Sequence, residues 1–338
     1  MAVDTLRHLL ALHVTPANEL ERAQVEELAK YGDSLGGEFR PAHWDYLPAS
    51  ELPRQSGDVM VEQWVREALV KLNPEIAAQP DRVDEVIYNL RACILSVQAD
   101  GLVRANENFT SWLRGEKTMP FSPNGEHVTV RLVDADHPGN NRLTVCNQWT
   151  YQVGAVEKRF DVVFVVNGLP PVIGEAKTPS RSAVTWFDGA FQINEMYEKQ
   201  VPAMFVPNVF SFATEGKLFS YGSIRTPIDM WGPWRDEENQ EEGQLHHVKA
   251  SVKSMLRHDV VLDMMQDFTL FATDKKHRRT KVICRYQQYF TTNQIVDRVV
   301  KGYPKKGSSG TSRAAASRCS WPLLLRGCAC TPDWAIPP

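Results

Sequence analysis

Two carboxylates and a lysine flank a predicted hairpin in the middle of the chain. Residues 159–179 read R-F-D-V-V-F-V-V-N-G-L-P-P-V-I-G-E-A-K-T-P, and an Asn-Gly pair between two apolar runs is a strong hairpin signal. We take the loop as Asn167-Gly168-Leu169. The antiparallel register then places Asp161 opposite Glu175, and Lys177, two residues further on, projects from the same face. A one-residue slip would turn Glu175 and Lys177 away from Asp161, so the prediction is specific.

The alternative interpretation is that these are ordinary surface charges on one sheet face. The flanking strands are almost wholly apolar, however, which suits burial on both faces. Two carboxylates about 4 Å apart repel by about 4 kcal/mol at an effective dielectric of about 20, and like charges that face each other across strands destabilise a hairpin. A hard divalent cation would compensate, because Mg²⁺ prefers carboxylate and water oxygens. The pattern therefore favours a metal site.

A metal-binding carboxylate pair with a lysine suits the hydrolysis of a phosphodiester. The metal polarises the phosphate and lowers the pKa of a bound water, while Lys177 orients or deprotonates that water and offsets the charge that builds on the phosphate. A glycosidase also uses two carboxylates, but it gains nothing obvious from a lysine two residues away.

The elements around this hairpin are predicted from hydrophobic periodicity. Helical spacing is found at Glu19–Tyr31, Asp58–Leu72 with Asp58 as a possible cap, Asp81–Ser96, Trp186–Lys199, Val252–Phe271 and Gln287–Val300. Apolar runs rich in Val, Ile and Phe are predicted as strands at Val128–Val133, Leu143–Val145, Phe160–Val166, Val172–Ala176 and Phe205–Phe212. Mixed strands and helices of this length indicate an α/β core with helices packed on a sheet.

The composition limits the class of protein. The chain has 338 residues, enough for two domains, and a net charge of −3, so DNA contacts must come from local basic patches. The basic run 275–281 is one such candidate, although a solvated linker is the simpler interpretation. No stretch approaches the roughly 20 apolar residues of a membrane span. The six cysteines follow neither a zinc nor a disulfide pattern, so we expect a reduced, cytoplasmic protein with no membrane contact.

An aspartate followed fourteen positions later by E-x-K resembles the PD-(D/E)xK nuclease superfamily. The whole stretch 159–179 is similar to the signature of the restriction (R) subunit of type I restriction–modification enzymes. Four other stretches agree with this family: Lys71-Leu72-Asn73-Pro74, Asn147-Gln148, Val201-Pro202-Ala203-Met204-Phe205 and Arg285-Tyr286-Gln287-Gln288. The resemblance covers roughly residues 58–307. It implies a PD-(D/E)xK nuclease-like mixed sheet flanked by helices, with N-terminal helices and a C-terminal helical linker.

The family resemblance also implies roles for particular residues. Asp161 and Glu175 would be ligands of Mg²⁺, and Lys177 would be the catalytic lysine. Gln148 belongs to the N-Q element of the family, with either a direct role in the site or an ordinary place in a turn. Arg285 and Gln288 resemble the adenine-reading element before a motor's phosphate loop, or else begin an exposed helix.

The helix after E-x-K departs from the family pattern. The family often carries a glutamine and a tyrosine four residues apart, whereas Gln192 and Tyr197 are five apart, about 140° round an α-helix, so they would not share a face. Tyr197 fits the family position, and Ile193 stands where the glutamine is expected. We therefore keep Gln192 and Tyr197 as candidate site residues, with Gln192 as a shifted substitute.

Four parts are predicted along the chain. They are an N-terminal helical extension (1–57), the nuclease domain (58–228), a linker leading to a missing helicase-like motor (229–306) and a frameshifted, disordered tail (307–338). The tail lacks the G-x-G-K-[ST] phosphate loop that the family carries after this linker. Codons chosen for the residues from Gly307 onward can nevertheless encode G-S-G-K-S in a shifted frame, which suggests a one-base deletion.

Two functional hypotheses follow from the resemblance. The first is a Mg²⁺-dependent endonuclease domain of a type I R subunit that cuts double-stranded DNA, with ATP used for translocation only in the full-length protein. Its partners would be the modification and specificity subunits of the restriction complex. The second is a catalytically inactive, truncated module that serves DNA docking or assembly in the same complex.

Overall fold

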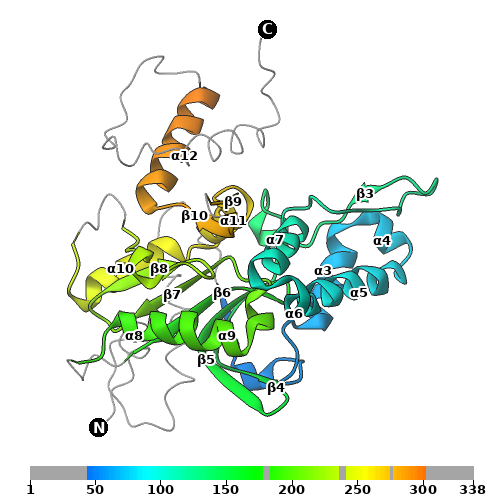
Figure 1. Ribbon diagram of the computed structural model, residues 1–338. Helices are drawn as coiled ribbons and strands as arrows, with labels where there is room; N and C mark the ends of the chain where they lie inside the picture. Colours follow the sequence, from blue (N-terminus) through cyan, green and yellow to red (C-terminus); the bar gives the residue numbers. More distant parts are fainter. Residues whose placement is uncertain (1–43, 178–182, 236–240, 275–276, 302–338) are drawn as a thin grey trace.

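The computed structural model describes residues 44–177, 183–235, 241–274 and 277–301 (Figure 1). The helix predicted at 19–31 and the tail predicted at 307–338 lie outside these described residues. So does the Thr-Pro pair that follows Lys177.

A six-stranded mixed sheet forms the centre of the fold. Its strands, in spatial order, are β1 (Asp45–Tyr46), β4 (Leu143–Val153), β5 (Val156–Val166), β6 (Leu169–Ala176), β7 (Phe210–Thr214) and β8 (Phe219–Gly222). The pairs β1–β4 and β6–β7 are parallel and the other neighbours are antiparallel. The inner strands β6 and β7 are buried along nearly their whole length. The predicted α/β class with a mixed sheet is confirmed.

Helices cover the sheet and extend its core. One group comprises α3 (Glu62–Leu72), α4 (Pro74–Ala78), α5 (Arg82–Leu95), α6 (Val97–Asp100) and α7 (Leu102–Leu113). The crossover from β6 to β7 carries α8 (Trp186–Phe191), the π-helical turn η4 (Gln192–Tyr197), α9 (Glu198–Gln200) and the 3-10 turn η5 (Pro202–Phe205). In Figure 1 the helices α8 and α9 run across the front of the sheet. The helices predicted at 58–72 and 81–96 are confirmed as α3 and α5, each a little shorter.

Asp58 does not cap α3. The helix begins at Glu62, and the Asp58 carboxylate instead accepts a hydrogen bond from the backbone amide of Gln55 at 2.8 Å, within the preceding turn. The carbonyl of Gly168, in the hairpin turn, accepts the amide of Val61 at 2.8 Å. The start of α3 is therefore anchored to the β5–β6 hairpin.

The predicted hairpin forms, but with a shorter turn than we expected. Asn167 and Gly168 have φ values of 51° and 88°, as in a two-residue turn with both central residues left-handed, and Leu169 already belongs to β6. The three-residue loop was therefore wrong. Glycine is required at position 168, because a Cβ there would lie 2.4 Å from the carbonyl oxygen of Val61.

A bulge in β6 restores the register that the longer loop would have produced. Val166 pairs with Leu169, and the register shifts between Phe164 and Val166. Beyond the bulge Val162 pairs with Gly174, which is the alignment that the sequence predicted. Pro170 and Pro171 of β6 together stand opposite Val165, and this extra residue of β6 compensates for the shorter turn.

Two short segments differ from their predicted structure near the start of the described chain. Residues 44–57 were predicted as part of a helical extension, yet they contain β1 and the 3-10 turn η2 (Ala49–Glu51). The stretch predicted as a strand at 128–133 contributes only β3 (Val128–Thr129), paired with β2 (Thr118–Met119). Two further 3-10 turns are η3 (Pro138–Asn140) and η6 (Ile228–Met230). Pairing of β1 with β4 is a non-local contact that periodicity does not reveal.

The predicted strand at 205–212 begins later than expected. The prolines at positions 202 and 207 fall in and after the turn η5, and regular pairing begins only at Phe210. Proline lacks the amide that a central strand must donate, which explains the delay.

The C-terminal part contains a hairpin whose first residues were predicted as the end of a helix. The stretch 252–271 divides into α10 (Leu245–Met255), α11 (His258–Gln266) and the first residues of β9 (Thr269–Thr273), which pairs with β10 (Arg279–Ile283). The break falls at Arg257, whose backbone is extended (ψ 140°). The last predicted helix is confirmed as α12 (Tyr286–Lys301).

Residues 275 and 276 of the predicted basic run 275–281 lie outside the described residues, and two cations of the described part are engaged with the protein itself. Lys281 is only 3% exposed, and its Nζ donates to the carbonyl of Asn208 at 2.6 Å. Arg279 pairs with Glu107 on α7. These two cations hold the hairpin against the core.

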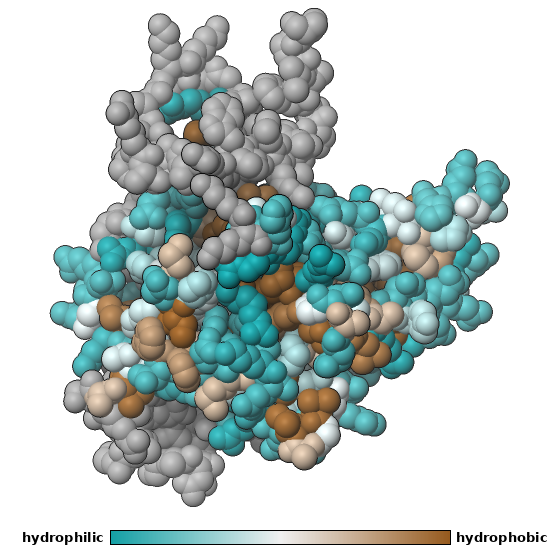
Figure 2. Space-filling model, viewed as in Figure 1, coloured by the Kyte–Doolittle hydropathy of each residue, from teal (hydrophilic) through white to brown (hydrophobic). Residues whose placement is uncertain are grey.

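The face of the molecule shown in Figure 2 is mostly hydrophilic over the described residues, with hydrophobic side chains gathered in smaller patches, the largest near α6 and α7. Among the described helices, none combines the length and the apolar character that crossing a membrane would require.

Candidate active site

Asp161 lies where β5 parts from β6. The last pair of the ladder on this side joins Val162 to Gly174. Beyond it, the backbone amide of Ala176 donates to Oδ2 of Asp161 at 3.0 Å, in place of a further backbone bond. The aspartate is thereby held at the edge of β6, next to Glu175, the residue that precedes Ala176.

Glu175 is buried beneath α8. Its side chain is 3% exposed, and α8 lies close above it at Gly189, where a Cβ would lie 3.1 Å from Cβ of Ala213 on β7 and 3.5 Å from Cγ of Glu175. Burial, and next the negative charge of Asp161, raise the pKa of Glu175 to about 8, against the opposing effect of Lys177. The structure therefore brings the two predicted carboxylates together.

Lys177 joins the carboxylates to the helical side of the site. Its Nζ donates to Oε1 of Glu175 at 2.7 Å and to Oε1 of Gln192 at 2.5 Å. Its backbone amide donates to the carbonyl of Thr214 on β7 at 2.8 Å. The side chain keeps 19% exposure, so the ammonium group reaches the site while its backbone stays in the sheet.

Gln192 and Tyr197 share a face, contrary to our prediction. Nε2 of Gln192 donates to the hydroxyl oxygen of Tyr197, while Ile193 is fully buried. The predicted separation of about 140° assumed an α-helix. The segment is instead a π-helical turn, η4, in which residues five apart follow one another along the same face.

Tyr197 completes the site on its inner side. Its hydroxyl donates to the carbonyl of Arg159 at 3.2 Å, and its ring packs edge-on to Phe160 with centroids 4.8 Å apart. Burial, and next the charge of Glu175, raise the pKa of Tyr197 above its ordinary value. The phenol is therefore a neutral hydrogen-bonding group at physiological pH.

Gln148 lies across from Asp161 on β4, between the pairs Asn147–Val162 and Trp149–Phe160. Its Nε2 is 3.5 Å from Oδ1 of Asp161. Of the two roles left open by the sequence, this position places the glutamine beside the candidate site and within a strand.

Arg285 and Gln288 make their contacts in another part of the molecule. Oε1 of Gln288 accepts the backbone amide of Arg285 at 2.8 Å, which caps the start of α12. The guanidinium of Arg285 donates to the carbonyl of Met230 and lies against Gly232. The structure does not bring this pair to the carboxylates.

The donor set at Asp161 and Glu175 fits a hard divalent cation. Oε2 of Glu175 is buried and accepts no hydrogen bond from the described residues, and a buried unpaired carboxylate oxygen is costly unless a cation or proton satisfies it. In the described part of the chain no three His, Cys, Asp or Glu side chains group as a metal site. Two carboxylates are sufficient for Mg²⁺, which usually retains several waters and takes further oxygens from phosphate.

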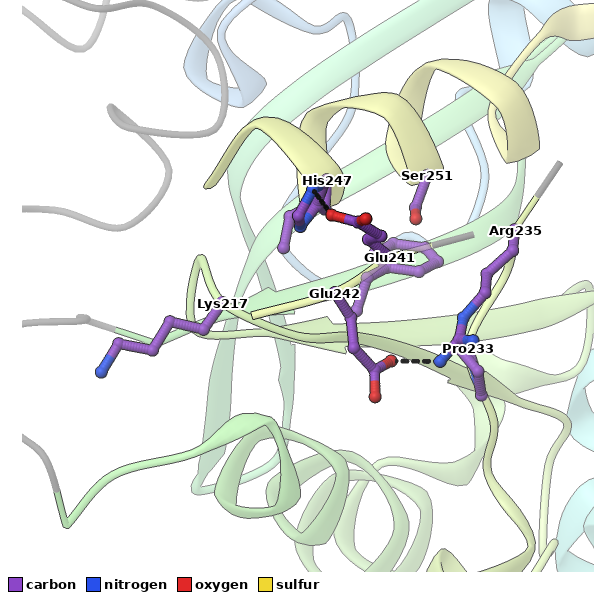
Figure 3. A pocket seen from close by; sticks show the side chains of 9 residues that line it. Lys217, Pro233, Arg235, Glu241, Glu242, His247 and Ser251 are labelled. Carbon is purple, nitrogen blue, oxygen red and sulfur yellow. Dashed lines mark hydrogen bonds and ion pairs between the residues drawn. The ribbon is translucent and has the colours of Figure 1, made fainter. Parts of the chain in front are cut away.

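A separate pocket lies between β8 and α10, away from these residues (Figure 3). Its charged side chains are largely matched: Arg235 pairs with Glu242 at 2.6 Å, and His247 lies 3.4 Å from Glu241. None of the predicted site residues lines it. The pair of carboxylates Asp161 and Glu175, where the pairing of β5 with β6 ends, is therefore the better candidate for chemistry.

Two contributors to the site were missed by sequence reasoning. The amide of Ala176 orients Asp161, and Gly189 lies at the close approach of α8 to Ala213 and Glu175. A glycine within a predicted helix is a recognised signal of close packing and could have been noticed. The amide of Ala176 carries no signal of its own in the sequence.

Comparisons with known proteins identify the family of the chain. The family described as "Type I restriction enzyme R protein N terminus (HSDR_N)" matches residues 37–229. The type I restriction enzyme HindI endonuclease subunit of Haemophilus influenzae is 31% identical over 303 residues, which are 86% of this chain and 27% of that protein. A protein of Methanocaldococcus jannaschii, named for an MjaIXP type I restriction endonuclease subunit, is 22% identical over 307 residues, 83% of this chain and 27% of its own length.

The chain thus spans about a quarter of the length of these relatives. The family match covers more than half of the chain, and the matched residues include Asp161, Glu175 and Lys177. The chain therefore belongs to the family of type I restriction enzyme R protein N termini.

Proposed function

We propose that this chain carries the DNA-cleaving site of a type I restriction endonuclease subunit. The reaction is Mg²⁺-dependent hydrolysis of a phosphodiester in double-stranded DNA. In the intact protein it is coupled to ATP-driven translocation, and the modification and specificity subunits are its partners. Arg285 and Gln288 would serve ATP only in such a longer protein.

The buried carboxylate of Glu175 is the observation that carries this proposal. This residue is 2% exposed, lies next to a second carboxylate and has one oxygen without a hydrogen-bond partner. Such an arrangement lowers the stability of the fold, so folding alone gives no reason for it. The same arrangement suits a site that binds a cation, because perturbed and unpaired groups concentrate where function requires them.

Asp161 and Glu175 would hold the metal, because their side chains come together where the pairing of β5 with β6 ends. When bound, Mg²⁺ supplies polarisation of the scissile phosphate and lowers the pKa of a bound water. The amide of Ala176 keeps Oδ2 of Asp161 in place, and Lys177 keeps Oε1 of Glu175 in place. Oε2 of Glu175, which has no hydrogen-bond partner among the described residues, would then bind the cation together with the carboxylate of Asp161.

Lys177 has the position of a group that acts on the attacking water or on the phosphate. Its ammonium has three protons to donate, and Glu175 and Gln192 accept two hydrogen bonds. A third N–H can reach a phosphate oxygen and offset the charge that develops there. Gln192 and Tyr197 then act as a brace that fixes the ammonium.

The test compares metal binding and DNA cleavage in matched variants. Mg²⁺ should raise the melting temperature of the wild-type protein, since a ligand at 100 times its Kd stabilises the fold by about 2.7 kcal/mol. Glu175→Ala and Asp161→Asn should lose both this rise and Mg²⁺-dependent nicking of plasmid DNA. Glu195→Gln, which changes a partly exposed carboxylate on η4, should keep both.

The result also separates the two functional hypotheses. A wild-type chain that binds DNA but shows no Mg²⁺-dependent stabilisation and no cleavage would support a docking or assembly module instead. Equal stabilisation by Mg²⁺ in the wild type and in Glu175→Ala would reject the site itself.

A further inference from the structure

The backbone of β4 is strained at one residue beside the candidate site. Among the described residues, four non-glycine residues have a positive φ, and Gln148, at 54°, is the only one of them within a β-strand. The others lie in turns and bends. A long side chain rarely adopts this conformation, and such strain in a folded protein concentrates at functional sites.

Near Gln148, the side chains of the neighbouring strand β5 change from one face of the sheet to the other. In a regular strand Phe160 and Phe164 would project to the same side. Phe164 packs against Phe212, whereas Phe160 packs against Tyr197. Ala213 faces α8, so its neighbour Phe212 projects from the other face of the sheet. Tyr197 belongs to η4, which continues from α8, so it lies on the face that α8 covers. The two partners are therefore on opposite faces. The reversal therefore falls between Phe160 and Phe164.

The pairing of β4 with β5 continues through the reversal without slipping. Asn147 pairs with Val162 and Trp149 with Phe160, so Gln148 and Asp161 are the two residues between them. Trp149 and Phe160 are both fully buried, while Gln148 and Asp161 are only half-buried. The left-handed backbone of Gln148 allows the β4–β5 pair to bury the rings of Trp149 and Phe160. Gln148 and Asp161 then remain half-buried where the pairing of β5 with β6 ends.

The Gln148 side chain ends at the aspartate. Nε2 lies 3.5 Å from Oδ1 of Asp161, and Oδ2 of the same carboxylate accepts the amide of Ala176 at 3.0 Å. The distance of 3.5 Å is at the outer limit of a hydrogen bond, and such contacts in free sites commonly shorten when the site is loaded. Both oxygens of Asp161 thus face a donor from a neighbouring strand.

We propose that Gln148 is a positioning residue that orients the Asp161 carboxylate for a divalent cation. This inference rests on the proposed function. Donors that hold a ligating carboxylate set its direction, and their loss typically lowers metal affinity by about 10- to 100-fold. A glycine would adopt the backbone of position 148 without strain, so backbone geometry alone gives no reason for a glutamine.

The strain provides a test that separates the side chain from the backbone. Gln148→Gly removes the amide and relieves the strain, so the metal-free protein should melt at the same temperature or higher. Its affinity for Mg²⁺, measured by titration calorimetry, should fall by about 10- to 100-fold. A purely structural role for the side chain predicts the opposite pattern, with lower stability and unchanged affinity.

Two further variants make the result decisive. Gln152→Gly places the same substitution in an exposed part of β4 and should leave Mg²⁺ affinity unchanged. Gln148→Asn keeps an amide and tolerates a left-handed backbone, but it is one methylene shorter and should bind Mg²⁺ less tightly than the wild type. It also serves if the glycine variant does not fold.

The outcomes distinguish this inference from the proposed function. If Gln148→Gly and Gln148→Asn both bind Mg²⁺ as the wild type does, while Glu175→Ala does not bind it, the positioning role is wrong and the metal site stands. If the wild type itself does not bind Mg²⁺, the proposed function fails, and this inference fails with it.

Discussion

Burial raises the pKa of two glutamates in this protein to about 8, but the two have different surroundings. Glu175 faces a second carboxylate and has an unsatisfied oxygen. Glu198, on α9, has no such conflict: its Oε2 accepts the amide of Arg225 at 2.9 Å and lies 3.6 Å from the guanidinium of the same residue. Glu198 is therefore a structural group, and Glu175 has the features of a metal ligand.

The pKa of Glu198 predicts a pH-dependent stability. Below pH 4.5 the carboxyl is protonated in the folded and unfolded chains alike. As the pH rises towards about 8, the unfolded chain releases this proton while the folded chain retains it, so the folded state loses stability. Glu198→Gln keeps an acceptor for the amide of Arg225 and has no proton to lose. We expect the variant to gain stability relative to the wild type between pH 4.5 and 8.

Urea unfolding of both proteins across this pH range, in EDTA, measures the effect. The midpoint of Glu198→Gln relative to the wild type should rise steadily with pH and level off above pH 8. Glu126→Gln, which removes an exposed carboxylate between β2 and β3, is the control for the loss of one negative charge, and the trend of Glu198→Gln should be clearly larger. A difference between Glu198→Gln and the wild type that stays constant with pH would contradict the assignment.

At the scale of elements, one π-helical turn decides which side chain reaches the site. The turn η4 holds one residue more than an α-helical path from Gln192 to Tyr197 would need. As a result Gln192 reaches Lys177 and Tyr197, and Ile193 is directed into the core. π-helical turns of this kind are frequent at functional sites.

Exchanging the two neighbouring side chains tests this assignment. The double variant Gln192→Ile with Ile193→Gln restores the spacing of four residues, yet the π-turn would direct the new glutamine into the core. An unpaired buried amide costs about 1–3 kcal/mol, and the brace on Lys177 is lost. We therefore expect lower stability in urea and loss of plasmid cleavage.

The single variant Gln192→Ala is the matched control for the exchange. It should lose cleavage with a much smaller loss of stability, because the alanine leaves no polar group buried. Full stability and activity of the double variant would show that the turn can revert to an α-helix, and η4 would then not be what selects Gln192.

At the scale of the whole molecule, the segment predicted as a linker packs on the predicted nuclease domain. Nζ of Lys281 donates to the carbonyl of Asn208 at 2.6 Å, and the hydroxyl of Tyr221 donates to the carbonyl of Cys284 at 2.7 Å. On α7, Nε of Arg114 donates to the carbonyl of Met265 at 3.1 Å. These contacts are buried or partly buried, so α11 and the β9–β10 hairpin complete the core.

We therefore expect the nuclease part to be unstable without this segment. A fragment of residues 58–228 loses β1 and every contact of α11 and β10, which exposes the ring of Tyr221 and the apolar face of α7. It should melt well below a chain of residues 44–301, or fail to accumulate as soluble protein. Circular dichroism melts of the two chains provide the comparison, and equal melting temperatures would establish 58–228 as an independent domain.

Local patterns were enough for much of the fold and for the centre of the candidate site. An Asn-Gly pair between apolar runs predicted the β5–β6 hairpin, and the period of two placed Glu175 and Lys177 on one face. Helical spacing located α3, α5 and α12 within a few residues. Such signals succeed because turn chemistry and hydrophobic periodicity act between residues close together in the chain.

Other features depend on contacts between distant parts of the chain, and no local pattern could reveal them. The two-residue turn and its compensating bulge, the pairing of β1 with β4, and the hairpin of β9 with β10 are all settled by packing against the finished core. The burial that raises the pKa of Glu175 requires α8 to lie against β6, and the π-turn that presents Gln192 arises where Ile193 must be buried. Residue types could thus be assigned to the site in advance, but their reach, charge state and mutual orientation follow from the assembled sheet and helices, because burial and long-range pairing exist only once the chain has folded.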